Sequence, residues 1–408
     1  MNFDFSDEQK QMRDEARKFL SEQCPPKAVR EVLDGKAPYD KSLWKGLAEM
    51  GFLGVAIPEQ FGGAGAGHLE LCVIAEEMGR ALAPVPFSST VYLAAEALLI
   101  AGSDAQKQKW LPKIASGDAI GTLALFEGKG NPSPKAVKVT ANGGVLNGVK
   151  KPVADGAIAD FAVVAARTGS SGRESDISLF IVDLKAAGVE VKSLTNIDLT
   201  RGQAEITFRN AKAEPLGAAG EGWSVITQVL DRAAVLTAFE QVGGTDRALE
   251  MGRDYALDRI AFGRPLGSFQ AVQQELADVY IVSQTLHVIA QSVAWRISEG
   301  LAGPGDRYET DPTIGAYWLA HREQLGAPSS RTPEGERCDE APTPVCRQSF
   351  DRADLLWDAA HGAQPLRGAF RGRYEEAMGA AEAPERTLPG GVVLQSFLAA
   401  DGTRTVLR

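Results

Sequence analysis

The sequence predicts an α+β fold: a helical N-terminal part, a β-rich middle part, a second helical part and an irregular tail. Apolar residues recur at helical spacing over about the first 120 residues. From Gly121 the pattern changes to short runs of β-favouring residues, broken by glycine-rich turns. Helical spacing returns near Trp223. We therefore expect four segments, at residues 1–120, 121–220, 221–318 and 319–408.

The composition is that of a globular protein, and it excludes two classes of partner. Of the 408 residues, 44% are hydrophobic and 24% are charged. The net charge of -10 argues against a surface for nucleic acid or anionic membranes, because both require concentrated Lys and Arg. No signal sequence and no apolar run of about 18 residues are visible. We expect a cytoplasmic protein with reduced cysteines and no metal site, since the four cysteines lack metal-ligand spacing.

The N-terminal helices are marked by their caps and stops. Ser6 and Gln9 predict a capping box, in which each side chain accepts a hydrogen bond from the other's backbone N–H. Apolar residues follow on one helical face, and Gly51 ends a later helix. The segment 54–65 is rich in Pro and Gly, which makes it too irregular for a helix or a paired strand.

The middle part predicts a small antiparallel barrel or sandwich. Its β-favouring runs are short and evenly spaced, and they are separated by turn signals such as Asn142-Gly143-Gly144 and Asn147-Gly148. The runs fall at residues 137–139, 145–146, 161–165, 179–182, 189–191 and 204–208.

Two long helical patterns meet at a short basic corner. Gly263 and Pro265 stop the first pattern, and Ser268 is a candidate N-cap for the second. Arg259 and Phe262 are three residues apart, so a helix reaching the turn places both on one face.

Spacing alone leaves the role of this corner open. The guanidinium of Arg259 can meet a pyrophosphate, with the ring of Phe262 beside it. The alternative is an ion pair of Arg259 with Asp258 or a neighbouring carboxylate, with Phe262 filling a joint between helices.

The residue pattern of this corner resembles that of a known family. The segment Arg259-x-x-Phe262-Gly263, followed by Gly267-x-x-Gln270-Ala271, resembles the signature corner of the flavin-dependent acyl-CoA dehydrogenases. The loop at residues 54–65 and the phrase at residues 106–117 match the same family in the same order. The resemblance implies that Arg259, Phe262 and Gln270 bind the FAD of a neighbouring subunit. It therefore also implies a homo- or hetero-oligomer, either a dimer or a tetramer.

The resemblance also implies a reaction. In that family a carboxylate removes the α-proton of an acyl-CoA thioester while hydride passes from the β-carbon to the flavin. We therefore expect oxidation of an acyl-CoA to an enoyl-CoA, with electrons passed to an electron-transfer flavoprotein. Fatty acid or sterol degradation is the implied context.

Glu240 is the candidate catalytic base. Gly243 and Gly244 lie three and four residues further on, so a ligand can approach the helix backbone beside the carboxylate. The neighbouring residues are apolar, which would raise the pKa of a buried carboxylate. The alternative is a glutamate on a solvated or salt-bridged face, with the glycines serving helix packing. Family members that carry the base on this helix place it nearer Ala233, about two turns earlier.

The middle part departs from the family pattern. Phe126 stands where a threonine is expected, and Pro152 and Ala154 stand where Trp and Thr are expected. Loss of these hydroxyls removes hydrogen bonds to the flavin ring. Similar departures occur in partner subunits of mixed bacterial assemblies. The alternative function is therefore a non-catalytic partner subunit that completes another chain's FAD site.

The tail at residues 319–408 matches no expected pattern. It is rich in Arg, Pro, Gly and Ala, a composition that buries too little apolar surface to offset the cost of ordering. Neither Gly390-Gly391 nor Tyr374-Glu375-Glu376 is followed by the residues the family has at its flavin-contacting turn and catalytic loop. Disorder or a shifted reading frame near residues 320–330 would each account for this composition.

Overall fold

The computed structural model describes residues 5–130 and 132–298, together with eight strand segments beyond residue 336. The chain divides into two compact units, Met1–Ala302 and Gly303–Arg408, each of which is described by itself. None of the described helices is long and apolar enough to cross a membrane.

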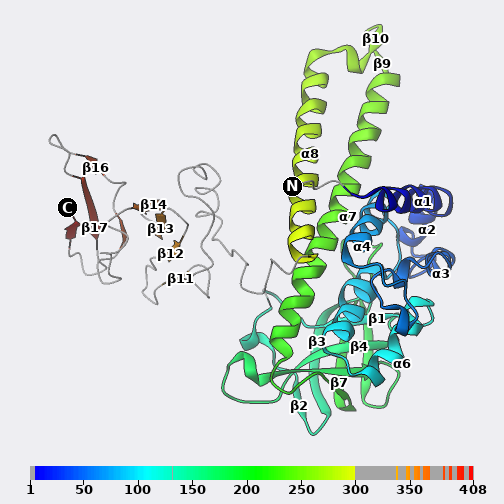
Figure 1. Ribbon diagram of the computed structural model, residues 1–408, viewed down its shortest axis with the longest axis vertical. Coiled ribbons are helices and arrows are strands. Elements are labelled where there is room, and N and C mark those ends of the chain that lie inside the picture. Colours follow the sequence, from blue (N-terminus) through cyan, green and yellow to red (C-terminus); the bar gives the residue numbers. More distant parts are fainter. Residues whose placement is uncertain are drawn as a thin grey trace. The chain divides into compact units, whose positions relative to one another are not determined.

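The first unit begins with helices, as the sequence predicts (Figure 1). The predicted capping box is confirmed at its start, where Ser6 Oγ accepts from the Gln9 N–H at 3.2 Å and Gln9 Oε1 accepts from the Ser6 N–H at 2.9 Å. The α-helices are α1 (Asp7–Gln23), α2 (Pro26–Leu33), α3 (Lys41–Glu49), α4 (His68–Ala81), α5 (Glu96–Ala101) and α6 (Asp104–Ala115). A π-helix, η3 (Ser88–Ala95), precedes α5 without a break.

The middle part forms one eight-stranded sheet in the order β6-β7-β3-β2-β4-β5-β8, with β1 paired to β4. Its strands are β1 (Gly121–Ala124), β2 (Thr140–Asn142), β3 (Val145–Ala154), β4 (Phe161–Arg167), β5 (Ile177–Asp183), β6 (Val189–Leu194), β7 (Gln203–Lys212) and β8 (Glu214–Leu216). Most neighbours are antiparallel, as predicted. β1 is an exception, because it runs parallel to β4 over four residue pairs. The β2–β3 hairpin lies between them in the chain, so the chain returns to β1 in the same direction.

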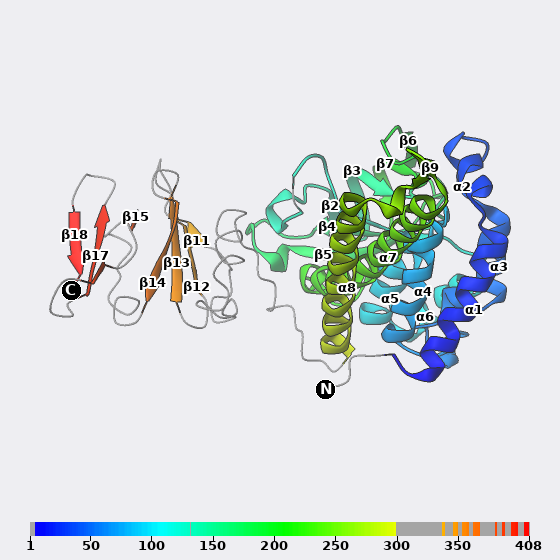
Figure 2. The same cartoon turned by 90° about the horizontal axis from the view of Figure 1, so that it is seen from above.

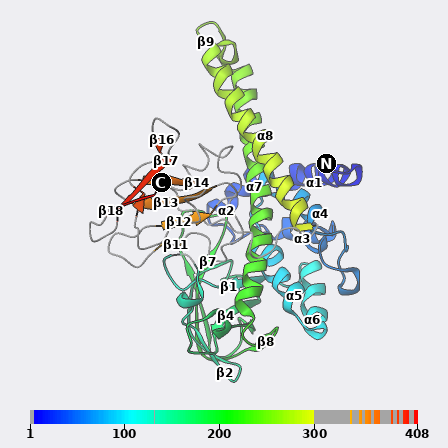
Figure 3. The same cartoon turned by 60° about the vertical axis from the view of Figure 1, so that its left-hand side comes forward.

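The second helical part is a long antiparallel hairpin of α7 (Gly222–Asp258) and α8 (Gln270–Ser298). Figure 3 shows this hairpin projecting beyond the other helices, with its corner at the tip. The corner contains the two-residue strands β9 (Ile260–Ala261) and β10 (Arg264–Pro265) and the short helix η6 (Leu266–Ser268). The prediction of Ser268 as N-cap of α8 is wrong, because its hydroxyl instead donates to the Pro265 carbonyl at 2.7 Å.

The helices lie side by side in the order α1, α4, α7, α8 (Figure 2). Glycine permits the closest approach, between α4 and α7. A Cβ placed on Gly79 would lie 1.9 Å from the Glu240 carbonyl oxygen, and one on Gly243 would lie 1.9 Å from the Glu76 carbonyl oxygen. The two backbones therefore touch, and only glycine fits at these two positions.

The second unit is described only at its strands, which form two four-stranded sheets. The strands are β11 (Arg337–Cys338), β12 (Cys346–Ser349), β13 (Ala353–Asp358), β14 (Gly362–Arg367), β15 (Ala380–Ala381), β16 (Arg386–Thr387), β17 (Val393–Leu398) and β18 (Arg404–Leu407). Tyr374-Glu375-Glu376 and Gly390-Gly391, which the sequence compares with the family's late motifs, lie outside the described residues.

Candidate functional site

A buried polar cluster forms where the two helical parts meet the sheet. Glu240 comes from α7, Arg201 from the loop between β6 and β7, and Asp155 from the turn after β3. Ser88 and Ser89 come from the first turn of η3. The guanidinium of Arg201 joins two of these elements, because Nη2 donates to Glu240 Oε2 at 2.9 Å and Nη1 donates to Ser88 Oγ.

The two carboxylate oxygens of Glu240 have different surroundings. Oε2 is held by Arg201, whereas Oε1 is buried and accepts no hydrogen bond from any residue in the described part of the chain. The Glu240 side chain is only 14% exposed. Such a carboxylate has one oxygen fixed in place and the other free to accept a proton.

The expectation of apolar surroundings for Glu240 is only partly correct. The predicted apolar neighbours Leu236, Phe239 and Val242 are buried. The carboxylate itself, however, meets Arg201 from a distant loop. Arg201 and Glu240 are 39 residues apart, so a search of the residues around Glu240 in the sequence does not find this partner.

Gly243 does not leave room for a ligand beside Glu240, contrary to the prediction from the sequence. Gly243 faces the α4 backbone at Glu76, and Gly79 of α4 faces Glu240 in return. These contacts match the alternative reading, in which glycine serves close helix packing. Any ligand must therefore reach Glu240 from a side other than that of α4.

Tyr92 adds a second buried atom without a partner. It lies on η3, is 1% exposed, and its hydroxyl meets no hydrogen-bond partner among the described residues. Burial, then the charge of the Glu240 carboxylate and its closeness as a hydrogen-bond acceptor, raise the pKa of Tyr92 well above its usual value. The hydroxyl therefore stays protonated and remains a potential donor next to Glu240.

Asp155 completes the cluster from the sheet. Ser89 Oγ donates to Asp155 Oδ2 at 2.6 Å, and the Asp155 N–H donates to the Gly202 carbonyl. Burial raises the pKa of Asp155, and the hydrogen bond from Ser89 partly offsets that effect. The cluster thus connects η3, two loops of the sheet and α7 through hydrogen bonds.

The predicted FAD-binding residues lie at the tip of the hairpin and are exposed. Phe262 is 95% exposed at a positive φ of 53°, and Arg259 and Gln270 are also exposed. Arg259 forms no ion pair with Asp258 or any other residue that the structure describes. The alternative in which Phe262 fills a helix joint is therefore wrong.

The corner and Glu240 belong to different places in the molecule. Arg259 follows the end of α7, nineteen positions after Glu240, which corresponds to about 28 Å along a helix. Within one chain the structure does not bring them together. The neighbouring side chains at the tip are Arg264 and Phe269, with the guanidinium 4.0 Å from the ring centroid.

The middle motif carries a buried ion pair where the family pattern has changed. Glu127 follows Phe126, and its Oε1 accepts from Lys150 Nζ at 2.6 Å. Lys150 is fully buried, and burial lowers its pKa to about 8. Phe126, Pro152 and Ala154 offer no hydroxyl at these three positions.

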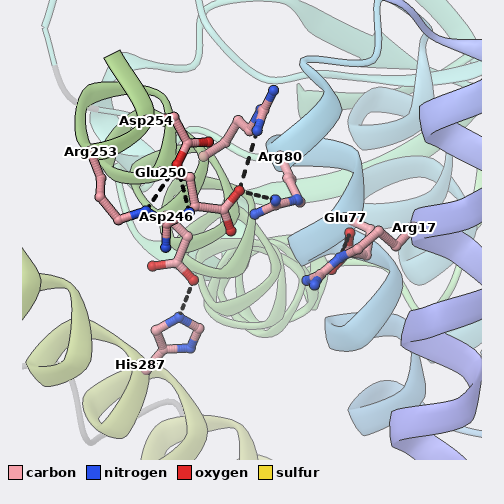
Figure 4. A network of polar contacts seen from close by, with 9 residues as sticks. Arg17, Glu77, Arg80, Asp246, Glu250, Arg253, Asp254 and His287 are labelled. Carbon is pink, nitrogen blue, oxygen red and sulfur yellow. Dashed lines mark hydrogen bonds and ion pairs between the residues drawn. The ribbon is translucent and has the colours of Figure 1, made fainter. Parts of the chain in front are cut away.

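The outer helices are linked by ion pairs. Figure 4 shows Arg17 with Glu77, which joins α1 to α4, and Arg80 with Glu250, which joins α4 to α7. Asp246 Oδ2 meets His287 Nε2 at 2.6 Å, which joins α7 to α8. Of the other histidines only His68 is described, and it meets Glu96 at 2.9 Å.

Comparison with protein families finds three matching models in order along the chain. Residues 6–118 match the acyl-CoA dehydrogenase N-terminal domain, residues 129–211 the middle domain, and residues 220–309 the C-terminal domain. These matches cover helices α1 to α6, strands β2 to β6 with most of β7, and the hairpin of α7 and α8.

Individual relatives agree with this result. The chain is 32% identical over 313 residues to mitochondrial isovaleryl-CoA dehydrogenase from Solanum tuberosum, covering 74% of this chain and 76% of the relative. It is 35% identical to acyl-CoA dehydrogenase FadE27 from Mycobacterium tuberculosis over 280 residues, covering 68% and 72%. The solved ChsE4-ChsE5 complex from Mycobacterium tuberculosis has a chain with a TM-score of 0.66 and 31% identity, covering 73% of this chain and 80% of that one. The chain therefore belongs to the acyl-CoA dehydrogenase family of oxidoreductases.

Proposed function

We propose that this protein oxidises an acyl-CoA thioester to its α,β-enoyl-CoA, with Glu240 as the base. Glu240 would take the α-proton, and bound FAD would supply the acceptor for the hydride from the β-carbon. The observation that supports this role is Oε1, which is buried and has no hydrogen-bond partner among the described residues, while Arg201 holds Oε2. A general base needs one such free oxygen within reach of the proton that it removes.

We propose that Arg259, Phe262 and Gln270 bind FAD in a site completed by a second subunit. The free guanidinium of Arg259 suits a pyrophosphate, and the exposed ring of Phe262 suits an aromatic or ribityl surface. These groups are exposed and lie about 28 Å from Glu240 of the same chain, so the flavin that they bind would serve the site of a neighbouring subunit. FAD supplies the hydride acceptor of the reaction.

We further propose that the electrons pass to an electron-transfer flavoprotein in the cytoplasm and that the working unit is an oligomer. Residues 1–120, 121–220 and 221–318 form its three domains, and residues 319–408 an additional tail. Bulky acyl groups such as sterol side chains are the proposed substrates.

A second candidate function is a partner subunit that supplies the corner to another chain and catalyses nothing itself. The observation behind it is the trio Phe126, Pro152 and Ala154. The ChsE4-ChsE5 complex provides a precedent for mixed assembly.

The visible spectrum of the protein purified alone tests both functions. A flavin band near 450 nm, roughly where oxidised flavins absorb, that bleaches when acyl-CoA is added without oxygen supports the enzyme. A colourless protein contradicts it. Restoration of a flavin band on co-expression with a second dehydrogenase chain would then support the partner subunit.

A further inference from the structure

The three donor groups of Glu76, Asp246 and His287 converge from three different helices. Glu76 lies on α4, Asp246 on α7 and His287 on α8, and their ligand atoms all lie within 4.8 Å of one another. Two carboxylates and one imidazole form a donor set that suits a borderline divalent metal such as Zn²⁺. Mg²⁺ and Ca²⁺ prefer more ligands, all of them oxygen.

Close helix packing places these groups together. Gly243 lies three residues before Asp246, on the same face of α7, and lets the α4 backbone touch α7 at Glu76. Four residues before His287, Ser283 reaches the same region from α8. These contacts bring the three donors together although none is near another in the sequence.

The cluster has the second layer of contacts that a metal site needs. Ser283 is 1% exposed, and its hydroxyl donates to Asp246 Oδ1, which leaves Oδ2 on the side of the imidazole. Such a hydrogen bond orients a metal-ligating carboxylate. The Asp246 and His287 side chains are 25% and 19% exposed, so an ion from solvent can reach them.

The Glu76 carboxylate lacks a partner that would explain its burial. Glu76 is 4% exposed, and no residue within the described ranges donates a hydrogen bond to it or forms an ion pair with it. Two nearby arginines are engaged elsewhere, because Arg17 pairs with Glu77 and Arg80 pairs with Glu250. The positive charges that act on Glu76 are those of His287 and Arg13, neither of which lies within ion-pair distance of it. A buried carboxylate is costly unless it is paired, protonated or bound to a metal, and burial raises the pKa of Glu76. The two carboxylates here face a single imidazole.

We infer that Glu76, Asp246 and His287 bind one Zn²⁺ ion, with water as the fourth ligand, and that this ion fastens α8 to α4 and α7. Tetrahedral coordination at bond lengths of about 2.0–2.2 Å places the donor atoms about 3.4 Å apart. The donor atoms lie within 4.8 Å of one another, and Asp246 Oδ2 and His287 Nε2, now 2.6 Å apart, would move apart to admit the ion. The role is structural, because the ion would join three helices and its ligands include neither Glu240 nor the residues of the hairpin corner.

Titration of the full-length protein with Zn²⁺ after dialysis against a chelator tests this inference. Calorimetry should give one Zn²⁺ per chain for the wild type. His287→Gln and the isosteric Glu76→Gln should each raise the dissociation constant for Zn²⁺ at least about 100-fold, and Ser283→Ala should raise it about 10–100-fold. Addition of Zn²⁺ should raise the melting temperature of the wild type but not of His287→Gln.

His68→Gln is the matched control. His68 also meets a buried carboxylate, Glu96, but that carboxylate is already paired with Arg232. Zn²⁺ binding should therefore be unchanged in this variant. Absence of binding to the wild type, or binding that survives both His287→Gln and Glu76→Gln, would overturn the site. A Co²⁺ spectrum with a thiolate charge-transfer band would also overturn it, because the proposed ligands contain no cysteine.

Discussion

Arg201 and Glu240 form a partly buried ion pair between a loop of the sheet and the long helix α7, with Nη2 2.9 Å from Oε2. The pair determines which oxygen of Glu240 is available, because Oε1 has no partner in the described structure. It also makes the position of Glu240 depend on the sheet as well as on its own helix. The first prediction concerns this carboxylate.

Glu240→Gln should retain bound flavin, but its turnover rate should fall at least about 100-fold, because an amide cannot take the α-proton. Turnover with acyl-CoA and flavin content per chain are the two measurements. Glu250→Gln is the control, since Glu250 also lies on α7 and also pairs with an arginine, Arg80. Near-normal turnover of Glu240→Gln would exclude it as the base.

The order of helical, β and helical parts could be predicted from the sequence because each depends on local periodicity. The capping box at Ser6 is also local and is confirmed. The parallel pairing of β1 with β4 is not local, since 36 residues separate Ala124 from Phe161. Periodicity predicts that a strand forms but does not give the strand with which it pairs.

The same distinction between local and distant residues applies to the candidate site. The basic corner could be found from the sequence because its residues fall within twelve positions of one another. The ion pair of Glu240 with Arg201 and the cluster of Glu76, Asp246 and His287 depend on distant segments. Gly243 and Gly244 are adjacent in the sequence, but only the position of α4 in the structure shows that Gly243 permits close helix packing.

Arg259→Ala should lose FAD, because the substitution removes the free guanidinium proposed to bind the pyrophosphate. The measurement is flavin content per chain after purification and gel filtration. Arg253→Ala is the control, since Arg253 is exposed on the same hairpin but is paired with the adjacent Asp254. If Arg259→Ala holds as much flavin as Arg253→Ala, the corner does not bind the cofactor.

Tyr92→Phe should leave the free energy of unfolding unchanged or raise it by up to about 1 kcal/mol, because the lost hydroxyl has no partner in the described structure. Ser89→Ala, on the same π-helix, should lower it by about 1–3 kcal/mol, since Ser89 donates to the buried Asp155. Denaturant unfolding of both variants measures the difference. Equal destabilisation would mean that the Tyr92 hydroxyl has a partner in solution.

Gly243→Ala and Gly244→Ala should change stability in opposite directions although the two glycines are adjacent on α7. At Gly243 the new Cβ would lie 1.9 Å from the Glu76 carbonyl oxygen, so α4 and α7 must move apart. At Gly244 the nearest atom would be 3.6 Å away, which is ordinary contact. Gly244→Ala should therefore stabilise the helix by about 0.5–1 kcal/mol, the usual gain over glycine. Gly243→Ala should destabilise the protein by about 1–3 kcal/mol, as overpacking does. Equal effects in denaturant unfolding would show that the helices do not touch at Gly243.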